Sequence, residues 1–342
     1  MEKYKKIIFD ETLKNASYIN SIRNKVFFIT GCTGLIGSYI CSYLEFLNFK
    51  FHLNNKIIGC ARSKEKFDSF NFDSVSYFKY DLNDRIIKYD GNIDYIIHTA
   101  SPTQSNYFIK NPVETIKSSF NAFETVLTFA KEKKVKSMVF LSTMEVYGIC
   151  CSDVLLCEDD CYPINSCNIR NSYPEVKRLL ECLACSYYSE YNLPVKIVRL
   201  SQTFGPGIDK NDNRVFAQFL RNALAHENII LKSKGDTKRS YCSIPDCING
   251  ILHVLISGEN AYPYNLASDN SFIDIVTLAN YFCLLANVKI EYNCDNNNSQ
   301  YLPTIKFGLD TKRIKGIGFK SVMDIEKTIY LLYESENEKN NI

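Results

Sequence analysis

A tyrosine and a lysine four residues apart form the first pattern in this chain that could do chemistry. They lie in the segment NSYPEVK, residues 171–177. A tyrosine hydroxyl has a pKa of about 10, so it is a poor base at neutral pH unless a nearby cation favours the phenolate. On a helix, residues four positions apart share a face, so Lys177 would supply that cation to Tyr173. The pair therefore predicts a tyrosine that could act as a base at neutral pH.

A helix that begins near Ser172 must position this pair. Ser172 and Glu175 match a capping box, and Pro174 falls in the first turn, where a missing N–H costs nothing. The apolar residues that follow have the spacing of a helix buried on one side: Val176, Leu179, Leu180, Leu183, Ala184 and Tyr187. Because the chain contains 23 tyrosines, the pair has meaning only together with the segments that precede it.

A glycine-rich turn near the N-terminus predicts a dinucleotide site. Residues 25–30, KVFFIT, read as a buried strand, and GCTGLIG at 31–37 leads into an apolar helix. In this context glycines permit a tight turn and let the backbone approach a pyrophosphate, whose charge meets the helix N-terminus. We expect the cofactor to contact the turn through Gly31, Thr33, Gly34, Leu35, Ile36 and Gly37.

The end of the next predicted strand bears on the choice of cofactor. Residues 56–60 form this strand, and ARSK follows it. NAD-binding units usually have an acidic residue here for the ribose hydroxyls, whereas an arginine accommodates a 2′-phosphate. Arg62 therefore slightly favours NADP, while NAD stays open because an arginine can also stack on adenine.

Three more strands complete the predicted sheet. Residues 75–80 lead to Asp81 and Leu82, which we expect at the adenine, and residues 93–98 lead to small residues against the cofactor, namely Thr99, Ala100 and Ser101. His98 ends a buried strand and is expected to pack there. A helix at 113–133 precedes a strand at 135–141, which delivers residues 142–148 to its carboxyl end, where open α/β sheets bind ligands.

Alternating strands and helices predict an α/β fold with a Rossmann-type, doubly wound parallel sheet. We expect an N-terminal extension at 1–24, a dinucleotide-binding domain at 25–200, and a smaller C-terminal substrate-binding domain within 201–342. Some later segments, such as a helix near 246–256, are expected to return to the main sheet.

Several motifs occur together and in order. After the glycine turn come TMEVYG at 143–148, the Tyr173 and Lys177 pair, VRLSQTFGP at 198–206, and RSYCSIPD at 239–246. In this combination the chain resembles the extended short-chain dehydrogenases/reductases of the NAD(P)-dependent nucleotide-sugar epimerase/dehydratase family. The resemblance extends from residue 25 to about 330 and implies a nucleotide-diphosphate sugar as substrate.

The resemblance also implies roles for individual residues. Tyr173 would be the base, and Lys177 would lower the pKa of Tyr173 and hold the nicotinamide ribose. Thr143 would hydrogen-bond the reacting oxygen, with Ser142 as the second candidate. Glu145 would make a second proton transfer or support a decarboxylation, or would only position the sugar. Substrate contacts would come from Thr143, Met144, Glu145 and Gln202, with Arg214 and Arg239 as the clamp on the diphosphate.

Departures from the family pattern bear on the reaction. Met144 stands where 4,6-dehydratases of this family have the aspartate that protonates the leaving hydroxyl. The Thr-x-Glu pattern is closer to UDP-glucuronate decarboxylases, but those carry a later arginine, whereas residues 301–306 read YLPTIK, with Lys306 as a possible substitute. Gln202 replaces the usual asparagine. Epimerisation through a transient ketone asks least of this site, and the alternatives are a decarboxylase, a 4,6-dehydratase, an NADPH-dependent ketosugar reductase, or a non-enzymatic NAD(P) sensor.

Composition limits the other function classes. The net charge is +2, with no basic block, so nucleic acid is not an expected partner. With no signal or membrane-length segment, we expect a cytoplasmic protein whose 14 cysteines are reduced thiols, and no metal site. The helices at 113–133 and 174–191 are expected to form the four-helix homodimer interface usual in this family.

Overall fold

The strand that leads into the glycine turn lies inside a parallel sheet. The computed structural model describes residues 2–81, 84–101, 105–293 and 306–340. In β1 (Val26–Thr30) every residue after the first is buried, as its apolar sequence predicts. β1 pairs in parallel with β2 (Lys56–Ala61) on one side and with β4 (Tyr95–His98) on the other.

Seven parallel strands form the main sheet, in the order β12-β7-β5-β4-β1-β2-β3. Strands β1 to β3 follow one another towards one edge, whereas β4 and the later strands run towards the other. The order therefore reverses between β1 and β4, and ligands bind at such a point, beyond the carboxyl ends of the strands. This arrangement confirms the predicted doubly wound sheet, whose other strands are β3 (Val75–Lys79), β5 (Ser137–Thr143), β7 (Val195–Leu200) and β12 (Pro263–Leu266).

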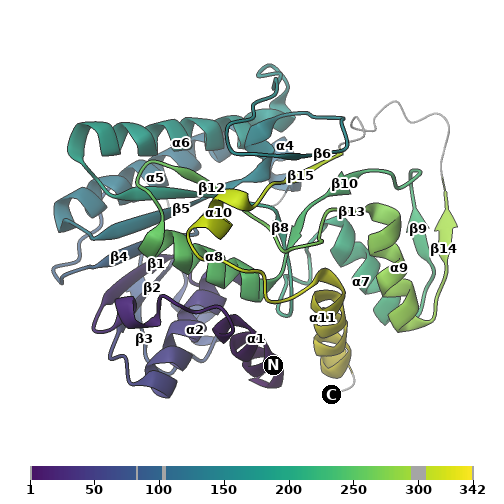
Figure 1. The fold of residues 1–342 in the computed structure, drawn as a ribbon, viewed down its shortest axis with the longest axis horizontal. Helices are drawn as coiled ribbons and strands as arrows, with labels where there is room; N and C mark the ends of the chain where they lie inside the picture. Colours follow the sequence, from purple (N-terminus) through teal and green to yellow (C-terminus); the bar gives the residue numbers. More distant parts are fainter. Residues whose placement is uncertain (1, 82–83, 102–104, 294–305, 341–342) are drawn as a thin grey trace.

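Helices cover both faces of this sheet (Figure 1). Successive strand residues point to opposite faces, so Phe27 and Phe28 belong to two different cores. Phe27 packs in the core shared with α1 (Glu2–Leu13), α2 (Leu35–Phe51) and α8 (Ile244–Ser257). Phe28 packs in the core shared with α5 (Pro112–Lys133) and α6 (Ser172–Tyr191). The glycine turn and the Tyr173 helix thus approach the strand ends from opposite faces.

A third core lies beside the sheet and is built from later segments (Figure 1). Phe216, Phe282 and Ile329 bring together α7 (Val215–Leu224), α9 (Ile275–Ala286) and α11 (Ile325–Asn340). Four two-stranded sheets connect the later segments: β8 (Gln202–Thr203) with β11 (Tyr241–Cys242), β9 (Ile229–Leu231) with β14 (Ile290–Tyr292), β10 (Lys238–Arg239) with β13 (Ile273–Asp274), and β6 (Val154–Leu156) with β15 (Phe307–Leu309).

Short helices complete the described chain. They are α3 (Lys64–Asp68), α4 (Ser105–Lys110), α10 (Lys312–Gly316) and the 3₁₀ turns η1 (Ile19–Ile22), η2 (Met144–Tyr147) and η3 (Ile169–Asn171). Among the helices of the described ranges, none is both long and apolar enough to cross a membrane.

The predicted capping box at the start of α6 is wrong. The helix begins at Ser172, and Asn171 is the N-cap residue without a side-chain cap bond. The Ser172 hydroxyl is buried and has no hydrogen-bond partner among the described residues, while the carboxylate of Glu175 accepts a bond from Ser166. The short turn η3 runs directly into α6, so the backbone before Ser172 is already helical. Ser172 therefore does not have the extended conformation that an N-cap residue needs.

The predicted buried stripes of α5 and α6 are only partly correct. Val176 and Leu180 are buried, but Leu179 is exposed. On α5, Phe123 is buried, whereas Val113 and Ile116, earlier in the helix, are also exposed. The spacing of apolar residues indicates which face of a helix can be buried. It does not show how much of that face a neighbouring element covers.

Candidate active site

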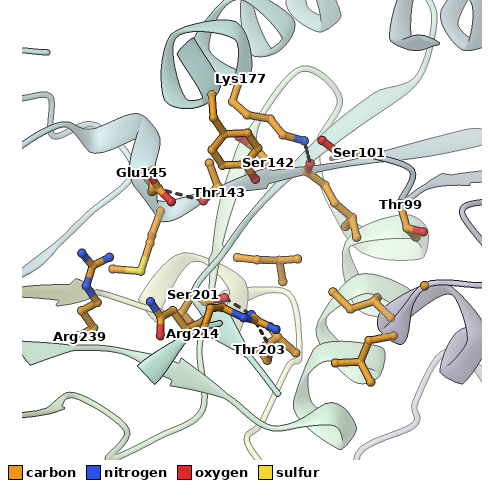
Figure 2. Close-up of a pocket in the computed structure, with 18 of the residues that line it drawn as sticks. Thr99, Ser101, Ser142, Thr143, Glu145, Lys177, Ser201, Thr203, Arg214 and Arg239 are labelled. Carbon is orange, nitrogen blue, oxygen red and sulfur yellow. Dashed lines mark hydrogen bonds between the residues drawn. The ribbon is translucent and has the colours of Figure 1, made fainter. Parts of the chain in front are cut away.

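A cavity of about 530 Å³ lies at the carboxyl ends of β1, β4 and β5. Figure 2 shows Thr99 at one end of it and Arg239 at the other, with Ser142, Thr143 and Lys177 between them. The structure brings most of the predicted site residues to its wall: Gly34, Leu35, Ile36, Gly37, Thr99, Ser101, Thr143, Met144, Glu145, Tyr173, Lys177, Gln202, Arg214 and Arg239.

The glycine turn is packed too tightly for any other residue. Gly31 has a φ of +71°, and a Cβ there would lie 2.7 Å from Thr99 Oγ1 and 2.9 Å from the backbone nitrogen of Ala100. A Cβ on Gly37 would lie 2.3 Å from the carbonyl oxygen of Gly31. The start of α2 therefore sits against the turn with its N-terminus at the cavity, which fits a pyrophosphate. Gly31 and Ala100 support this wall, and neither they nor Thr33 line the cavity.

The residues predicted for the adenine end lie apart from the cavity. Arg62 is exposed, and its Nε is 4.0 Å from a carboxylate oxygen of Asp81. The two residues follow the carboxyl ends of β2 and β3, where an adenosine could lie against them. The predicted contact at Leu82 falls outside the described residues.

Lys177 is buried, and its ammonium group is held from several sides. Nζ donates a 2.8 Å hydrogen bond to the carbonyl oxygen of Leu141 and lies 4.7 Å from the centre of the Phe140 ring. Burial lowers the pKa of Lys177 to about 7, and the charge of Glu181 opposes this effect. The charge of Lys177 near neutral pH therefore depends on the groups that surround it.

The ring of Tyr173 lies 5.8 Å from Lys177 Nζ, measured to the ring centre. Burial raises the pKa of Tyr173, the negative charge of Glu145 adds to this, and a hydrogen bond with Thr143 opposes it. The neighbouring arginines Arg214 and Arg170 also lower the pKa. The raised pKa favours the protonated form of Tyr173 in this structure.

Two adjacent hydroxyls at the end of β5 have different surroundings. Ser142 Oγ donates a 2.5 Å hydrogen bond to a carboxylate oxygen of Glu181, away from the reacting centre. Thr143 Oγ1 accepts a 3.3 Å bond from the backbone N–H of Glu145 and keeps its own proton to donate. This geometry favours Thr143 over Ser142 as the partner of a reacting oxygen.

Glu145 is paired with an arginine that sequence reasoning missed. Arg170 Nη1 lies 3.3 Å from Glu145 Oε2, both side chains are partly exposed, and both line the cavity. Arg170 comes from η3, three residues before Tyr173. That offset places side chains on the same side of a helical segment, and it was the available signal.

The predicted diphosphate clamp divides into one occupied and one open arginine. Arg214 makes three bonds of 2.6–3.1 Å to the Asp212 carboxylate and also donates to the carbonyl oxygen of Thr203. For Arg239, no ion pair to another described residue is found, and its side chain lines the cavity at the end away from Thr99 (Figure 2). Lys306, the suggested substitute for a carboxylate-binding arginine, is not part of the cavity wall.

Further polar residues of the wall were not anticipated. Ser201 lines the cavity, and its buried hydroxyl has no hydrogen-bond partner within the described chain. A buried polar group without a protein partner is uncommon, so this hydroxyl is available to water or to a bound molecule. Asn213 also lines the cavity, just before α7. The described cysteines are free thiols.

Comparisons with known proteins agree with this fold. The family model "NAD dependent epimerase/dehydratase family" matches residues 27–267. The chain is 26% identical over 331 residues to UDP-glucuronic acid decarboxylase 5 of Arabidopsis thaliana, covering 94% of this chain and 92% of the relative. It is 27% identical over 256 residues to the dTDP-D-glucose 4,6-dehydratase of Dictyostelium discoideum, covering 70% and 58% of the two chains.

Solved structures share the whole architecture. The UDP-N-acetylglucosamine 4-epimerase of Methanobrevibacter ruminantium superposes with a TM-score of 0.78 at 21% identity, covering 93% of this chain and 99% of that one. The UDP-glucuronic acid 4-epimerase of Bacillus cereus, solved with NAD, gives 0.75 at 17% identity, covering 92% and 99%. The fold and the cavity define a nucleotide-cofactor enzyme of the short-chain dehydrogenase/reductase type. The chain belongs to the NAD-dependent epimerase/dehydratase family.

Proposed function

We propose that this protein is a nucleotide-sugar epimerase that oxidises its substrate to a transient keto sugar and reduces it again. The observation that carries the proposal is the convergence of Thr143, Tyr173 and Lys177 in one cavity that also contains the glycine turn and the open Arg239. Met144, which has no proton to give, stands beside Glu145 in the wall. Loss of a hydroxyl therefore has no evident acid, and return of the hydride is the simpler outcome.

In this proposal, separate residues of the cavity transfer the proton, stabilise the phenolate and bind the diphosphate. Tyr173 removes the proton of the sugar hydroxyl, Lys177 stabilises the phenolate, and Thr143 donates a hydrogen bond to the oxygen that becomes a carbonyl. After the sugar turns its other face, Tyr173 returns the proton. Arg239 and the α7 N-terminus hold the diphosphate, so that the sugar can turn without leaving.

The glycine turn fits a nicotinamide dinucleotide, because Gly31 and Gly37 leave no space for a Cβ. A nicotinamide bound there would supply reversible hydride transfer with the sugar. We propose NAD or NADP as cofactor, and the exposed Arg62 favours NADP because a guanidinium binds a 2′-phosphate well. Calorimetric titration with NAD and NADP tests this, since Arg62→Ala should weaken NADP binding more than NAD binding.

The experiment that tests the reaction is incubation of the purified protein with a panel of UDP- and dTDP-sugars, followed by NMR and mass spectrometry. An epimerase gives an isomer of unchanged mass, with no added cofactor consumed. Tyr173→Phe should lower turnover about 100-fold or more, as expected for loss of an acid–base group, with cofactor affinity nearly intact. Product that forms only as NADPH is consumed would refute the epimerase and indicate a reductase.

A second candidate function is decarboxylation of a nucleotide-activated sugar acid. Arg170 favours it, because this arginine lines the cavity beside Glu145 and could bind a sugar carboxylate. Relatives named UDP-glucuronic acid decarboxylase resemble the chain over most of its length. The same mass spectra separate the two functions, because a decarboxylase product has lost carbon dioxide.

We also propose that the protein is a homodimer joined through α5 and α6. The two helices pack side by side on one face of the sheet (Figure 1). They leave large apolar side chains exposed, namely Val113, Ile116, Leu179, Tyr188 and Tyr191. An apolar surface formed by paired helices is suited to a second copy of itself, because a two-fold axis places the same patch on both sides.

A further inference from the structure

A largely buried ion pair begins one helical turn after the proposed catalytic lysine. The Glu181 carboxylate accepts two bonds from Arg199 Nε, at 3.1 and 3.2 Å, and one from Arg199 Nη2 at 2.7 Å. Ser142 adds a fourth bond at 2.5 Å. The side chains of Glu181 and Arg199 are only 11% and 13% exposed. Glu181 lies on α6 and its two partners lie on β7 and β5, so the carboxylate is held by two strands of the sheet.

Glu181 follows Lys177 by one helical turn, so the two side chains share a face of α6. The other groups packed around the Lys177 ammonium carry little charge. They are the Phe140 ring and the Leu141 carbonyl on β5, the Tyr173 ring on α6, and His98 on β4. His98 accepts or donates a 2.9 Å bond with Thr30 Oγ1, and burial lowers its pKa to about 3, so this imidazole is neutral.

Among the described groups, Glu181 is thus the anion that acts on Lys177. A buried amine without an anionic neighbour tends to give up its proton. A neutral amine could not favour the Tyr173 phenolate, so an anion near Lys177 has a function in the proposed mechanism. Glu181 is itself largely buried, and a buried charged group needs a partner of opposite charge and hydrogen bonds.

Arg199 and Ser142 provide that pairing. The guanidinium binds both carboxylate oxygens, and the arginine is itself anchored by a 2.8 Å bond from Nη1 to the carbonyl oxygen of Glu158. An arginine remains protonated at any working pH. Charge therefore alternates along the series Lys177, Glu181 and Arg199, from the cavity wall into the sheet.

We propose that Glu181, held in place by Arg199, is a positioning residue that maintains Lys177 as an ammonium group in the active site. The inference itself concerns the charge of Lys177. Its effect on turnover rests on the proposed function, because there Lys177 acts on the reaction through Tyr173. It also gives Ser142 a role outside the reaction, as a donor that orients the Glu181 carboxylate.

The test measures the protonation of Lys177 directly. Lys177 lines the cavity, so a small amine-reactive compound such as cyanate can reach it. Cyanate reacts only with the neutral form of the lysine amine. Trace labelling of the full-length protein from pH 5 to 9, with mass spectrometry of the Lys177 peptide, gives the titration midpoint. In Glu181→Gln we expect the midpoint to fall by about one pH unit or more.

Two further variants make the outcome decisive. Glu181→Gln leaves a buried guanidinium unpaired and could fail to fold, so the double variant E181Q/R199M removes both charges and should fold while still lowering the midpoint. Ser142→Ala removes one hydrogen bond and no charge, and its midpoint should stay near that of the wild type. An unchanged midpoint in both Glu181 variants, or an equal fall in Ser142→Ala, overturns the proposal.

The activity measurement separates this inference from the proposed function. If the wild type converts a nucleotide sugar, kcat of the Glu181 variants at pH 8 should fall more than kcat at pH 6, while KM changes little. A purely structural role would lower kcat equally at both pH values and would overturn the inference. A midpoint shift in a protein that converts no nucleotide sugar supports the role of Glu181 and refutes the proposed function.

Discussion

The ring of Phe108 lies flat against the ring of Tyr173. The ring centres are 4.3 Å apart, and the planes differ by only 2°. Phe108 is buried and comes from α4, which lies between β4 and α5 in the sequence. Such a stack confines the tyrosine ring to one plane, which limits the positions that its hydroxyl can take in the cavity.

Replacing Phe108 should therefore impair catalysis more than binding. In Phe108→Ala the tyrosine ring gains freedom, and kcat should fall by about tenfold, because small misplacements of a reacting group are costly. Phe108→Tyr preserves the stack and is the matched control. Steady-state kinetics of both variants check this, with thermal melts to measure stability. Equal kcat values for wild type and Phe108→Ala would show that the stack has no part in positioning Tyr173.

The pKa of Lys177 makes a prediction about stability. Its folded-state pKa of about 7 lies below the ordinary 10.5, so burial of the charged form destabilises the folded protein. The unfolded chain keeps this proton up to a higher pH than the folded protein does. The loss of free energy of unfolding is therefore complete at and below pH 7, and it disappears as the pH rises to about 10.5, where the lysine is neutral in both states.

Lys177→Met should therefore be inactive but more stable than the wild type at pH 6, by on the order of 1–3 kcal/mol after loss of the bond to Leu141. The advantage should shrink at pH 9. Urea unfolding of both proteins at the two pH values measures it. A variant that is less stable at pH 6 than at pH 9, relative to the wild type, would contradict the assignment.

The sequence predicted some of the parts of this molecule that depend on local chemistry, although the capping box of α6 was wrong. The glycine turn and the Tyr173 helix could be recognised because φ > 0 at Gly31 and the four-residue offset to Lys177 are local requirements. Phe108 could not be predicted in the same way, since its contact with Tyr173 joins segments 65 residues apart. The Glu181 and Arg199 pair also depends on α6 packing against β7, and the spacing of charges along the chain does not reveal it.

The position of Arg170 in the cavity wall predicts a preference for sugars that carry a carboxylate. If the sugar carries a carboxylate, Arg170→Gln should raise KM about tenfold or more, because it removes a charge-assisted bond of about 1.5–3 kcal/mol. For a neutral sugar the same change should alter KM only about twofold. Parallel kinetics with UDP-glucuronate and UDP-glucose measure the difference, and Arg170→Lys, which keeps the charge, is the control. Similar KM changes for both substrates would limit Arg170 to orienting Glu145.

The apolar surface of α5 and α6 predicts the oligomeric state. Ile116 and Leu179 are 43% and 48% exposed on the two adjacent helices. A charge at each position would have to be buried without a partner in a dimer, which costs far more than exposure in a monomer. The double variant I116D/L179D should therefore elute as a monomer, whereas the wild type should have the mass of a dimer by light scattering.

The matched control lies on another face of the molecule. Leu284 on α9 is 79% exposed, so Leu284→Asp adds a charge to an apolar surface position outside α5 and α6. It should leave the dimer mass unchanged, because the proposed interface does not include α9. If the wild type is a monomer at micromolar concentration, or if Leu284→Asp dissociates the dimer while I116D/L179D does not, the proposed interface is wrong.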